Sequence, residues 1–179
     1  MASSARSRPR VDWQFSICHG ADMATWRDFE RLRPDLAEAG RALLYQFGVG
    51  LAFLGTVRID GGPRLHPMCP LLTEEGLYAF IVESPKVKDL LRDGRYAMHS
   101  FPSQHNEDAF YLMGASRRVD DPSLREQLAE QFVAERSTLR VPPPGEAELI
   151  FGFDVERCLL TRTTGHGDPS PLHEVWRAP

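Results

Sequence analysis

Short apolar segments joined by tight turns dominate the middle of the chain. Residues 49–59 are rich in β-branched and aromatic side chains, residues 64–72 form the expected return strand with Pro67 and Pro70 marking an edge or a bulge, and residues 77–82 form the next strand. The turn D-G-G-P separates the first two segments, and glycine supplies the positive φ that a hairpin turn needs. The turn T-E-E-G separates the second from the third. Short, closely spaced strands of this kind favour an antiparallel sheet over a parallel, doubly wound one.

Three further strands are expected, over residues 96–101, 109–119 and 148–163. Gly114 is expected to mark a bulge or bend inside the second of them. The six segments predict a fold of the α+β class, mainly β: a six-stranded antiparallel barrel with peripheral helices. No G-x-G-x-x-G follows any of these segments, so a Rossmann nucleotide site is not expected.

Helical periodicity appears at the front of the chain and before the last strand. Apolar residues recur at helical spacing from Thr25 to Phe47, and Pro34 and Gly40 interrupt them, which predicts two helices, with Asp35 as a cap for the second. A further helix is expected over 122–135, capped by Asp120 or Asp121.

The domain organisation follows from these elements. We expect an N-terminal arm over residues 1–23, partly disordered, in which Trp13, Phe15 and Ile17 alternate with polar residues. One barrel domain over 24–163 and a loop-like tail over 164–179 are expected to follow.

Composition limits the classes of function. The 179 residues carry a formal net charge of −4, which gives no support to a nucleic-acid surface. Cys18, Cys69 and Cys158 are scattered, as in reduced thiols rather than a disulfide framework or a zinc site. The chain shows no secretory signal and no apolar run long enough to cross a bilayer, so a cytoplasmic protein without membrane partners is expected.

A strand, a turn and a short helix over residues 78–92 carry the strongest site signal. Ser84 stands at the N-cap position and Pro85 at the first helical position. Lys86 and Lys88 follow in the first turn, where cations oppose the helix macrodipole. A bound anion would remove this conflict, because free backbone N–H groups, a hydroxyl and an ammonium would converge on one phosphate. The alternative is a capped surface helix with two solvated lysines.

The order of the motifs resembles one known family. L-G-T-V, D-G-G-P-R, P-M-C-P, then G-L-Y-A-F-I-V-E-S-P-K-V-K-D-L-L-R-D-G-R-Y-A-M-H-S-F-P and F-Y-L-M-G-A-S-R stand in the order seen in the pyridoxamine 5′-phosphate oxidase-like split barrels. The resemblance covers roughly residues 43–120. It implies a homodimer with FMN held at the interface, one phosphate site formed by an Arg, a Ser and a Lys, and redox chemistry carried by the flavin.

The resemblance assigns cofactor contacts to two segments. The phosphate would meet the basic residue that opens the strand after the D-G-x-P turn and the S-x-K segment, and the ring would meet the same strand and the end of the strand before the helix. The implied cofactor-binding residues are Arg64, His66, Pro67, Met68, Ile81, Val82, Ser84 and Lys86, with Glu83 beside the ring and Lys88 as a second phosphate contact. No catalytic residue and no metal ligand is assigned.

Departures from the family pattern make vitamin B6 oxidation doubtful. Cys69 stands where the oxidases proper carry a Lys, and Ala109 stands where they carry a Gln from the partner subunit. Their C-terminal R-L-H-x-R segment has no counterpart in L-H-E-V-W-R-A-P. The substrate would be met by the loop over 102–108 and by the tail after Thr163, which the resemblance covers least.

Three functions are therefore in competition. The first is an FMN-dependent oxidoreductase acting on an unknown small molecule, with NADH and NADPH as the first reductants to test. The second is a deazaflavin-dependent reductase, whose longer anionic cofactor tail would use Arg58, Arg92 and Arg95. The third is a non-catalytic flavin- or heme-binding protein, in which only His66 or His99 could serve as the heme ligand.

Overall fold

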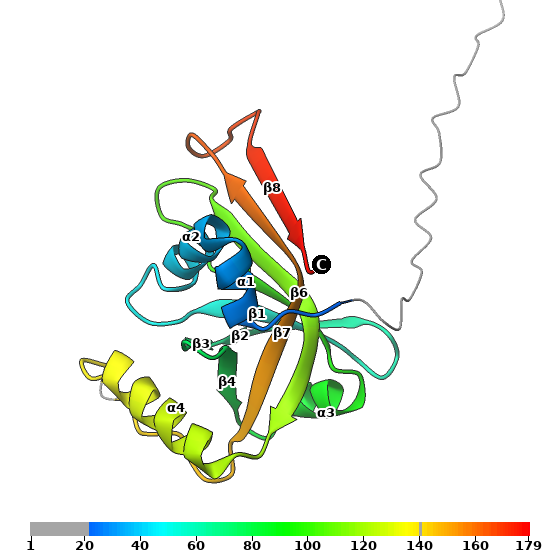
Figure 1. The fold of residues 1–179 in the computed structure, drawn as a ribbon, viewed down its shortest axis with the longest axis vertical. Coiled ribbons are helices and arrows are strands. Elements are labelled where there is room, and N and C mark those ends of the chain that lie inside the picture. Colours follow the sequence, from blue (N-terminus) through cyan, green and yellow to red (C-terminus); the bar gives the residue numbers. More distant parts are fainter. Residues whose placement is uncertain (1–21, 140) are drawn as a thin grey trace, which may run out of the picture.

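An antiparallel sheet of eight strands forms the body of the molecule (Figure 1). The computed structural model describes residues 22–139 and 141–179. The sheet order is β2-β1-β5-β6-β7-β4-β3, and β8 pairs with β7 beside this path. The strands are β1 (Ala52–Val57), β2 (Pro63–Met68), β3 (Leu71–Leu72), β4 (Leu77–Ile81), β5 (Arg95–Ser100), β6 (Ala109–Val119), β7 (Leu149–Arg162) and β8 (Leu172–Arg177).

Two long strands carry the curvature of the sheet. β6 has 11 residues and β7 has 14, and they pair with each other along almost their whole length. Their register shifts between Met113 and Gly114, which confirms the bulge predicted there. A Cβ on Gly114 would lie 2.0 Å from the carbonyl oxygen of Asp154, so only glycine allows the strands to approach at this point.

Four helices accompany the sheet: α1 (Trp26–Leu32), α2 (Pro34–Leu44), α3 (Pro85–Arg92) and α4 (Pro122–Glu135). As predicted, Pro34 ends one helix and opens the next, whereas Gly40 lies inside α2 without breaking it. Asp35 does not cap α2, because it lies inside the helix and pairs with Arg33 instead. Asp121 caps α4 by accepting hydrogen bonds from two backbone amides.

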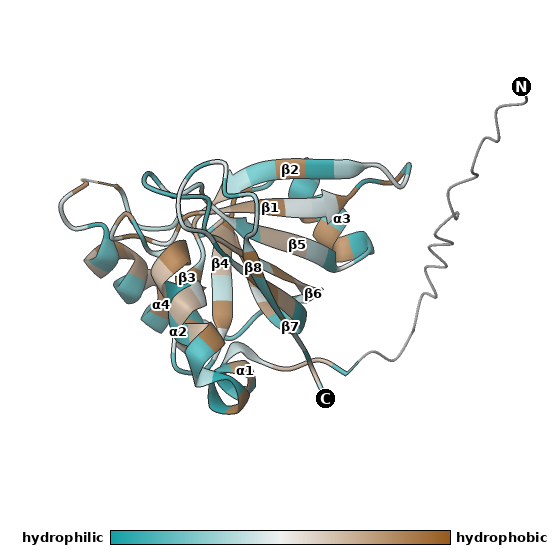
Figure 2. Cartoon of the chain, turned by 90° about the horizontal axis from the view of Figure 1, so that it is seen from above, coloured by the Kyte–Doolittle hydropathy of each residue, from teal (hydrophilic) through white to brown (hydrophobic). Residues whose placement is uncertain are grey.

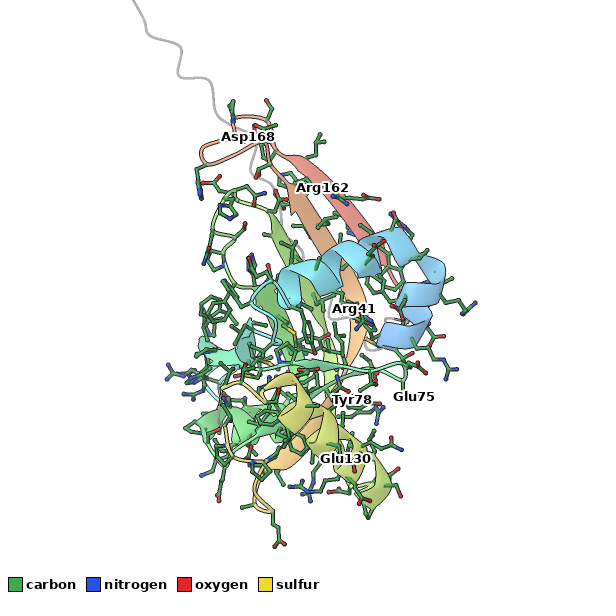
Figure 3. All side chains as sticks on the ribbon, turned by 90° about the vertical axis from the view of Figure 1, so that its left-hand side faces the viewer. Arg41, Glu75, Tyr78, Glu130, Arg162 and Asp168 are labelled. Carbon is green, nitrogen blue, oxygen red and sulfur yellow. The ribbon has the colours of Figure 1, made fainter. Side chains whose placement is uncertain are left out.

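The main core lies between the sheet and α1 and α2. Trp26 and Phe29 of α1 and Phe110 of β6 are fully buried, and the Trp26 ring meets the other two edge-on. A second, smaller cluster joins α4 to the other end of the sheet through Leu71, Tyr78, Leu128 and Ile150 (Figure 3, where Tyr78 is labelled). Helices therefore cover both ends of the inner side of the sheet.

The predicted barrel is confirmed, but it has eight strands instead of six. The predicted strand over 64–72 divides into β2 and β3 at Cys69 and Pro70, where the Pro70 carbonyl oxygen would lie only 2.0 Å from a Cβ on Gly50. The tail was expected to be loop-like, and this was wrong: β8 pairs with β7 from Leu172 to Arg177. The arm with Trp13, Phe15 and Ile17, and Cys18 with it, lies outside the described residues.

The longest described helix has 14 residues, and none within the described ranges combines the length and the apolar character of a membrane span.

Strand pairing separates an inner from an outer side of the sheet at β1, β5 and β6. Leu54 and Met98 pair across β1 and β5 and are buried toward the core. Side chains alternate along each strand, so the neighbouring positions face the other side of the sheet, which we call the outer face. Its residues on these three strands are Phe53, Gly55, Val57, Ala97, His99, Tyr111 and Met113. In Figure 2, β2 and β1 run side by side at one edge of the sheet, with α3 next to them.

Gly40 tests how tightly α2 packs on the sheet. A Cβ at this position would lie 2.5 Å from the Phe110 ring, which neighbouring aromatic rings hold in place. In an open helix, Gly→Ala stabilises by about 1 kcal/mol, but overpacking costs about 1–3 kcal/mol. We expect Gly40→Ala to lower the free energy of unfolding in urea denaturation, and to do so less when Phe110 is also Leu. A stabilised Gly40→Ala protein would contradict this packing.

Candidate functional site

The site predicted from sequence lies where α3 runs along β2. β4 ends at Ile81, and Ser84 precedes α3 in an extended conformation, with φ −166° and ψ 167°. The Ser84 hydroxyl donates to the carbonyl oxygen of Val82 at 2.9 Å and does not cap the helix. The first turn of α3 contains no acidic residue. Its amide groups therefore present a partial positive charge with no side-chain acceptor from the described residues.

Lys86 lies in this first turn and is half-buried, whereas Lys88 is exposed. Burial lowers the pKa of Lys86, and the neighbouring Cys69 thiol opposes the shift. Within the described ranges neither lysine forms an ion pair, and the carboxylate of this helix, Asp89, is bound to arginines instead. Lys86 is therefore a cation that has lost part of its hydration without gaining a carboxylate.

The sequence carries a signal here that the motif analysis missed. Lys86 and Lys88 are the only two lysines of the chain, and all its other basic residues are arginine. Lysine offers a compact ammonium where arginine offers a planar fork. Both lysines stand in one helical turn, which singles this turn out from the rest of the basic residues.

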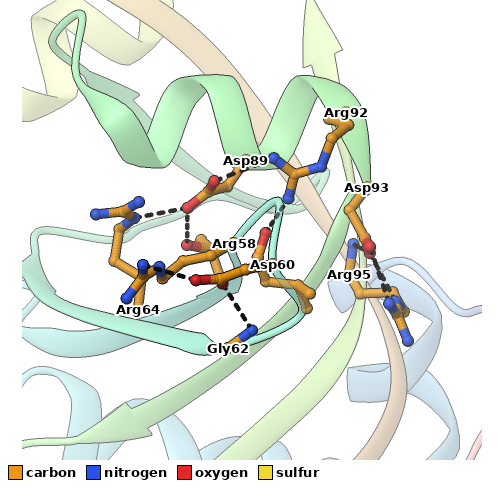
Figure 4. A network of polar contacts seen from close by, with 10 residues as sticks. Arg58, Asp60, Gly62, Arg64, Asp89, Arg92, Asp93 and Arg95 are labelled. Atoms are coloured by element: carbon orange, nitrogen blue, oxygen red, sulfur yellow. Dashed lines mark hydrogen bonds and ion pairs between the residues drawn. The ribbon is translucent and has the colours of Figure 1, made fainter.

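Arg64 lies opposite the same helix. It pairs with Thr56 across β1 and β2, which turns both side chains toward the inner side of the sheet. The Arg64 Nε donates to the Asp89 carboxylate at 2.7 Å, and the Thr56 hydroxyl donates to the same oxygen at 3.0 Å. Arg92 donates to the other carboxylate oxygen of Asp89 at 3.3 Å (Figure 4). Sequence reasoning missed Asp89, because nothing in the chain relates it to an arginine 25 residues earlier.

Asp89 is a buried charge, only 4% exposed. Burial would raise the pKa of its carboxyl group, but the hydrogen bonds from Arg64, Thr56 and Arg92 outweigh it, so the pKa is lowered. The carboxylate thus stays ionised and joins α3 to β1 and β2.

The other predicted contacts fall on both sides of β2 and β4. His66 and Met68 face the inner side with Arg64, while Pro67 faces outward. Ile81 is buried in the core, which leaves it little surface for a ligand, whereas Val82 is 55% exposed. Cys69 directly follows β2 and lies beside Lys86, whereas Arg64, the second residue of β2, lies beside Asp89, one turn later in α3. Arg64 and Lys86 thus both lie where α3 runs along β2, near opposite ends of the strand, and His66 stands between them in the sequence of β2.

The three arginines considered for a longer anionic tail are each occupied. Arg58 pairs with Asp60 at 2.8 Å and Arg95 with Asp93 at 2.6 Å. Arg92 pairs with Asp89 and also donates to the carbonyl oxygen of Val57 (Figure 4).

His99 has one defined nitrogen. Its Nδ1 lies 2.6 Å from the carbonyl oxygen of Ser100, and a carbonyl can only accept, so Nδ1 carries the proton and Nε2 the lone pair in the neutral ring. His99 is exposed on the outer face, between Phe53 and Tyr111 on the neighbouring strands. Trp176 packs against Phe29 of α1 at 4.8 Å and thus fastens the C-terminal strand to the core of its own chain.

A groove of about 310 Å³ crosses the outer face. Gly55 and Ala97 pair across β1 and β5 at the floor of the groove. The space above them is open because neither has a long side chain. It is also lined by Val57, Pro63, Arg95, Tyr111 and Met113. The helices α2 and α3 contact the inner side of the sheet, where Gly40 faces Phe110 and Asp89 faces Thr56. The described part of the chain leaves this largely apolar face open to solvent.

No family model and no curated protein sequence matches the chain. Solved structures do. A heme binding protein from Mycobacterium smegmatis superposes with a TM-score of 0.58 and 14% identity over 78% of this chain, which spans 57% of that protein. General stress protein 26 from Bacillus anthracis gives 0.56 and 15%, with 78% and 96% of the two chains covered.

A third structure comes from Clostridium acetobutylicum, a protein related to general stress protein 26 and described as of the pyridoxinephosphate oxidase family. It gives a TM-score of 0.52 and 14% identity, with 84% and 95% of the chains covered. The chain has the split-barrel fold of these proteins. At these identities the likeness concerns the fold, and the fold includes neighbours described as heme-binding as well as oxidase-like ones. Within the described ranges, no cluster of three or more His, Cys, Asp or Glu side chains could hold a metal ion.

The lowered pKa of Asp89 predicts how stability depends on pH. Above the pKa of about 3.9 of an unfolded Asp, Asp89 is ionised in both states and its hydrogen bonds stabilise the fold fully. This stabilisation is lost as the pH falls through the lower pKa of the folded state. We expect Asp89→Asn to lower the free energy of unfolding by about 1–3 kcal/mol at neutral pH, and the difference from wild type to close below about pH 4.

Asp60→Asn is the matched control, since the Asp60 pair with Arg58 is exposed and contributes about 0–1 kcal/mol. Urea denaturation across the pH range measures both variants. A difference between wild type and Asp89→Asn that stayed constant into the acid range would contradict the assigned charge.

Proposed function

We propose that this chain binds FMN and acts as an FMN-dependent oxidoreductase on a small molecule, with the flavin held between two copies of the chain. The observation that carries the proposal is Lys86, a half-buried lysine in the first turn of α3 that has no carboxylate partner among the residues that the structure describes. Burying part of an ammonium costs free energy unless an anion compensates. In the first turn Pro85 has no N–H, and the Val87 and Lys88 amides donate to the Ser84 carbonyl oxygen at 3.1 and 3.4 Å. A phosphate at this point would therefore meet the ammonium and the backbone amide of Lys86 at the positive end of the helix.

Arg64 would complete the phosphate site from the facing strand. Only its Nε is used by Asp89, and Figure 4 draws no contact from its two terminal nitrogens. Guanidinium nitrogens bind phosphate oxygens well because two of them can donate in parallel. The Ser84 hydroxyl lies one residue before the helix and can turn from Val82 to the phosphate.

The flavin ring would then lie along β2, against backbone groups of His66, Pro67 and Met68, with Val82 at its side. FMN supplies the redox chemistry when bound. The chain's own task is to hold the phosphate, orient the ring and exclude water, and this fits a site without a catalytic triad. The reductant class to test first is NADH or NADPH. Cys69 and Cys158 are free thiols in the structure, in keeping with a reducing, cytoplasmic location.

A homodimer is part of the proposal. The outer face carries Phe53, Val57, Ala97, Tyr111 and Met113 and remains open in the single chain. These side chains are partly buried in the single chain. A partly exposed apolar face can serve as an interaction surface, and a twofold pair of identical faces is the commonest arrangement. A second copy on this face would also add a wall next to β2.

Two other cofactors, a deazaflavin and heme, are alternatives to FMN. A deazaflavin would need cations for its longer tail, and Arg58, Arg92 and Arg95 are already paired with carboxylates, which favours FMN. Heme is the second candidate function, since His99 presents an unprotonated Nε2 on an aromatic face and one fold neighbour is described as a heme binding protein. His66 shares the inner side with Arg64 and is the less accessible ligand.

FMN titration of the purified, ligand-stripped protein tests the proposal. We expect flavin fluorescence to be quenched on binding, and Lys86→Ala to weaken FMN binding by about 1–3 kcal/mol, the cost of losing a charged hydrogen bond. Lys88→Ala is the matched control and should change FMN affinity much less, because Lys88 is exposed.

An unchanged affinity in Lys86→Ala would disprove the phosphate assignment. Protein that binds no flavin but takes up heme, with a Soret band lost in His99→Ala and kept in His66→Ala, would replace FMN by the second candidate. Preferential binding of a deazaflavin would favour the first alternative.

The dimer is tested separately on the outer face. Ala97→Arg places a charge at the floor of the groove without touching the core. We expect the wild-type chain to be a dimer in light scattering at micromolar concentration and Ala97→Arg to be monomeric. Val133→Arg on the exposed side of α4 is the control and should stay dimeric. A monomeric wild-type protein would contradict the proposed interface.

A further inference from the structure

We propose that Asp89 is a positioning residue that aims the terminal nitrogens of Arg64 at an anionic ligand. This inference rests on the proposed function, because it concerns the phosphate end of the same cofactor. It gives a role to a buried carboxylate that the FMN model itself does not require.

The guanidinium of Arg64 is bound to Asp89 through one nitrogen only. Asp89 takes the Nε–H of Arg64 at 2.7 Å and forms no bond to its terminal nitrogens. A guanidinium is planar, so fixing Nε fixes its plane. One terminal nitrogen shares the edge that Nε turns toward Asp89, and the end of the group that carries both terminal nitrogens stays free for a second partner. Figure 4 shows the single contact from the Arg64 Nε to Asp89, with no dashed line from either terminal nitrogen of Arg64. An arginine that only neutralised Asp89 could instead offer two parallel N–H groups to it.

The carboxylate of Asp89 is itself held in place. The side chain is 4% exposed and lies on α3, and both carboxylate oxygens are occupied, one by Arg64 and Thr56 and the other by Arg92. A carboxylate held in this way cannot follow a moving partner. Arg64, whose side chain is 28% exposed, is therefore the element that is held, and Asp89 is the support.

The Arg64 side chain lies on the side of β2 along which α3 runs. Asp89 stands one helical turn after Lys86 on α3. Arg64 approaches that helix from β2, and Lys86 lies beside Cys69 at the other end of the same strand. We place the phosphate between these two positions, where Lys86 would act as a point charge and the free end of the Arg64 guanidinium would reach along β2 as a fork.

The sign of the effect separates positioning from neutralisation. If Asp89 only cancelled the charge of Arg64, then removing its negative charge would strengthen the binding of an anion. If Asp89 positions Arg64, removing it frees the guanidinium to rotate and weakens binding. The two roles therefore predict opposite changes in FMN affinity.

The test compares FMN with riboflavin, which lacks the phosphate, in titrations of the full-length protein. We expect Arg64→Ala and Asp89→Asn each to raise the Kd for FMN about tenfold, the equivalent of one charged hydrogen bond. Neither should change the Kd for riboflavin. The double variant should bind FMN no more weakly than Arg64→Ala, because Asp89 acts through Arg64. Thr56→Val, which removes another donor to Asp89 and leaves Arg64 in place, is the matched control and should keep most of the affinity.

Several results would overturn the inference. These are FMN binding in Asp89→Asn that is unchanged or tighter, an equal loss for riboflavin, or an additive loss in the double variant. Wild-type protein that binds no FMN would remove the proposed function and this inference together, whereas loss in Arg64→Ala without loss in Asp89→Asn removes the inference alone. If Asp89→Asn does not fold, Arg64→Lys provides the test. A lysine keeps the positive charge but cannot bind Asp89 and also present two further aligned donors, so we expect the affinity for FMN to fall. An affinity equal to that of the wild type would overturn the positioning role.

Discussion

The ion pair between the buried carboxylate of Asp89 and Arg64 joins the elements on which the site depends. It ties α3 to β2 while Thr56 ties the same carboxylate to β1. A buried charge is tolerated only where hydrogen bonds replace its water, and here three side chains do so. The helix therefore has a fixed position along the strand, and its uncapped first turn with Lys86 is held at a fixed place beside β2. Without this link, the basic residues of the two elements would be separate surface charges.

The rest of the fold explains why the site can lie at an edge of the barrel. The inner side of the sheet is filled by the aromatic cluster around Phe110 at one end and by the contacts of α4 at the other. The outer face carries small and apolar residues around Gly55 and Ala97, and the described helices pack elsewhere. One chain thus has charged residues between β2 and α3 on the inner side of the sheet and an apolar face on the outer side. The first is the proposed site of the flavin phosphate, and the second is the proposed contact with another copy of the chain.

Much of the fold could be predicted from the sequence, because local signals determine it. Pro34 divided the first helical segment, Asp121 capped α4 and Gly114 marked the bulge, each for a reason that lies within a few residues. The tail was misread since β8 has no strong alternation and owes its conformation to pairing with β7. Strand pairing over such a distance leaves little trace in a single sequence. The same holds for Asp89 and Arg64, whereas the restriction of lysine to one helical turn was visible in the sequence from the start.

The central claim is that Lys86 contacts the phosphate of a bound flavin nucleotide, and the two lysines of the chain allow a direct measurement. Brief acetylation with an amine-selective reagent, followed by mass spectrometry, reads Lys86 and Lys88 separately within one helical turn. We predict that saturating FMN protects Lys86, that riboflavin does not, and that Lys88 reacts similarly in all three samples. Equal modification of Lys86 with and without FMN, in protein shown to bind the flavin, would contradict it.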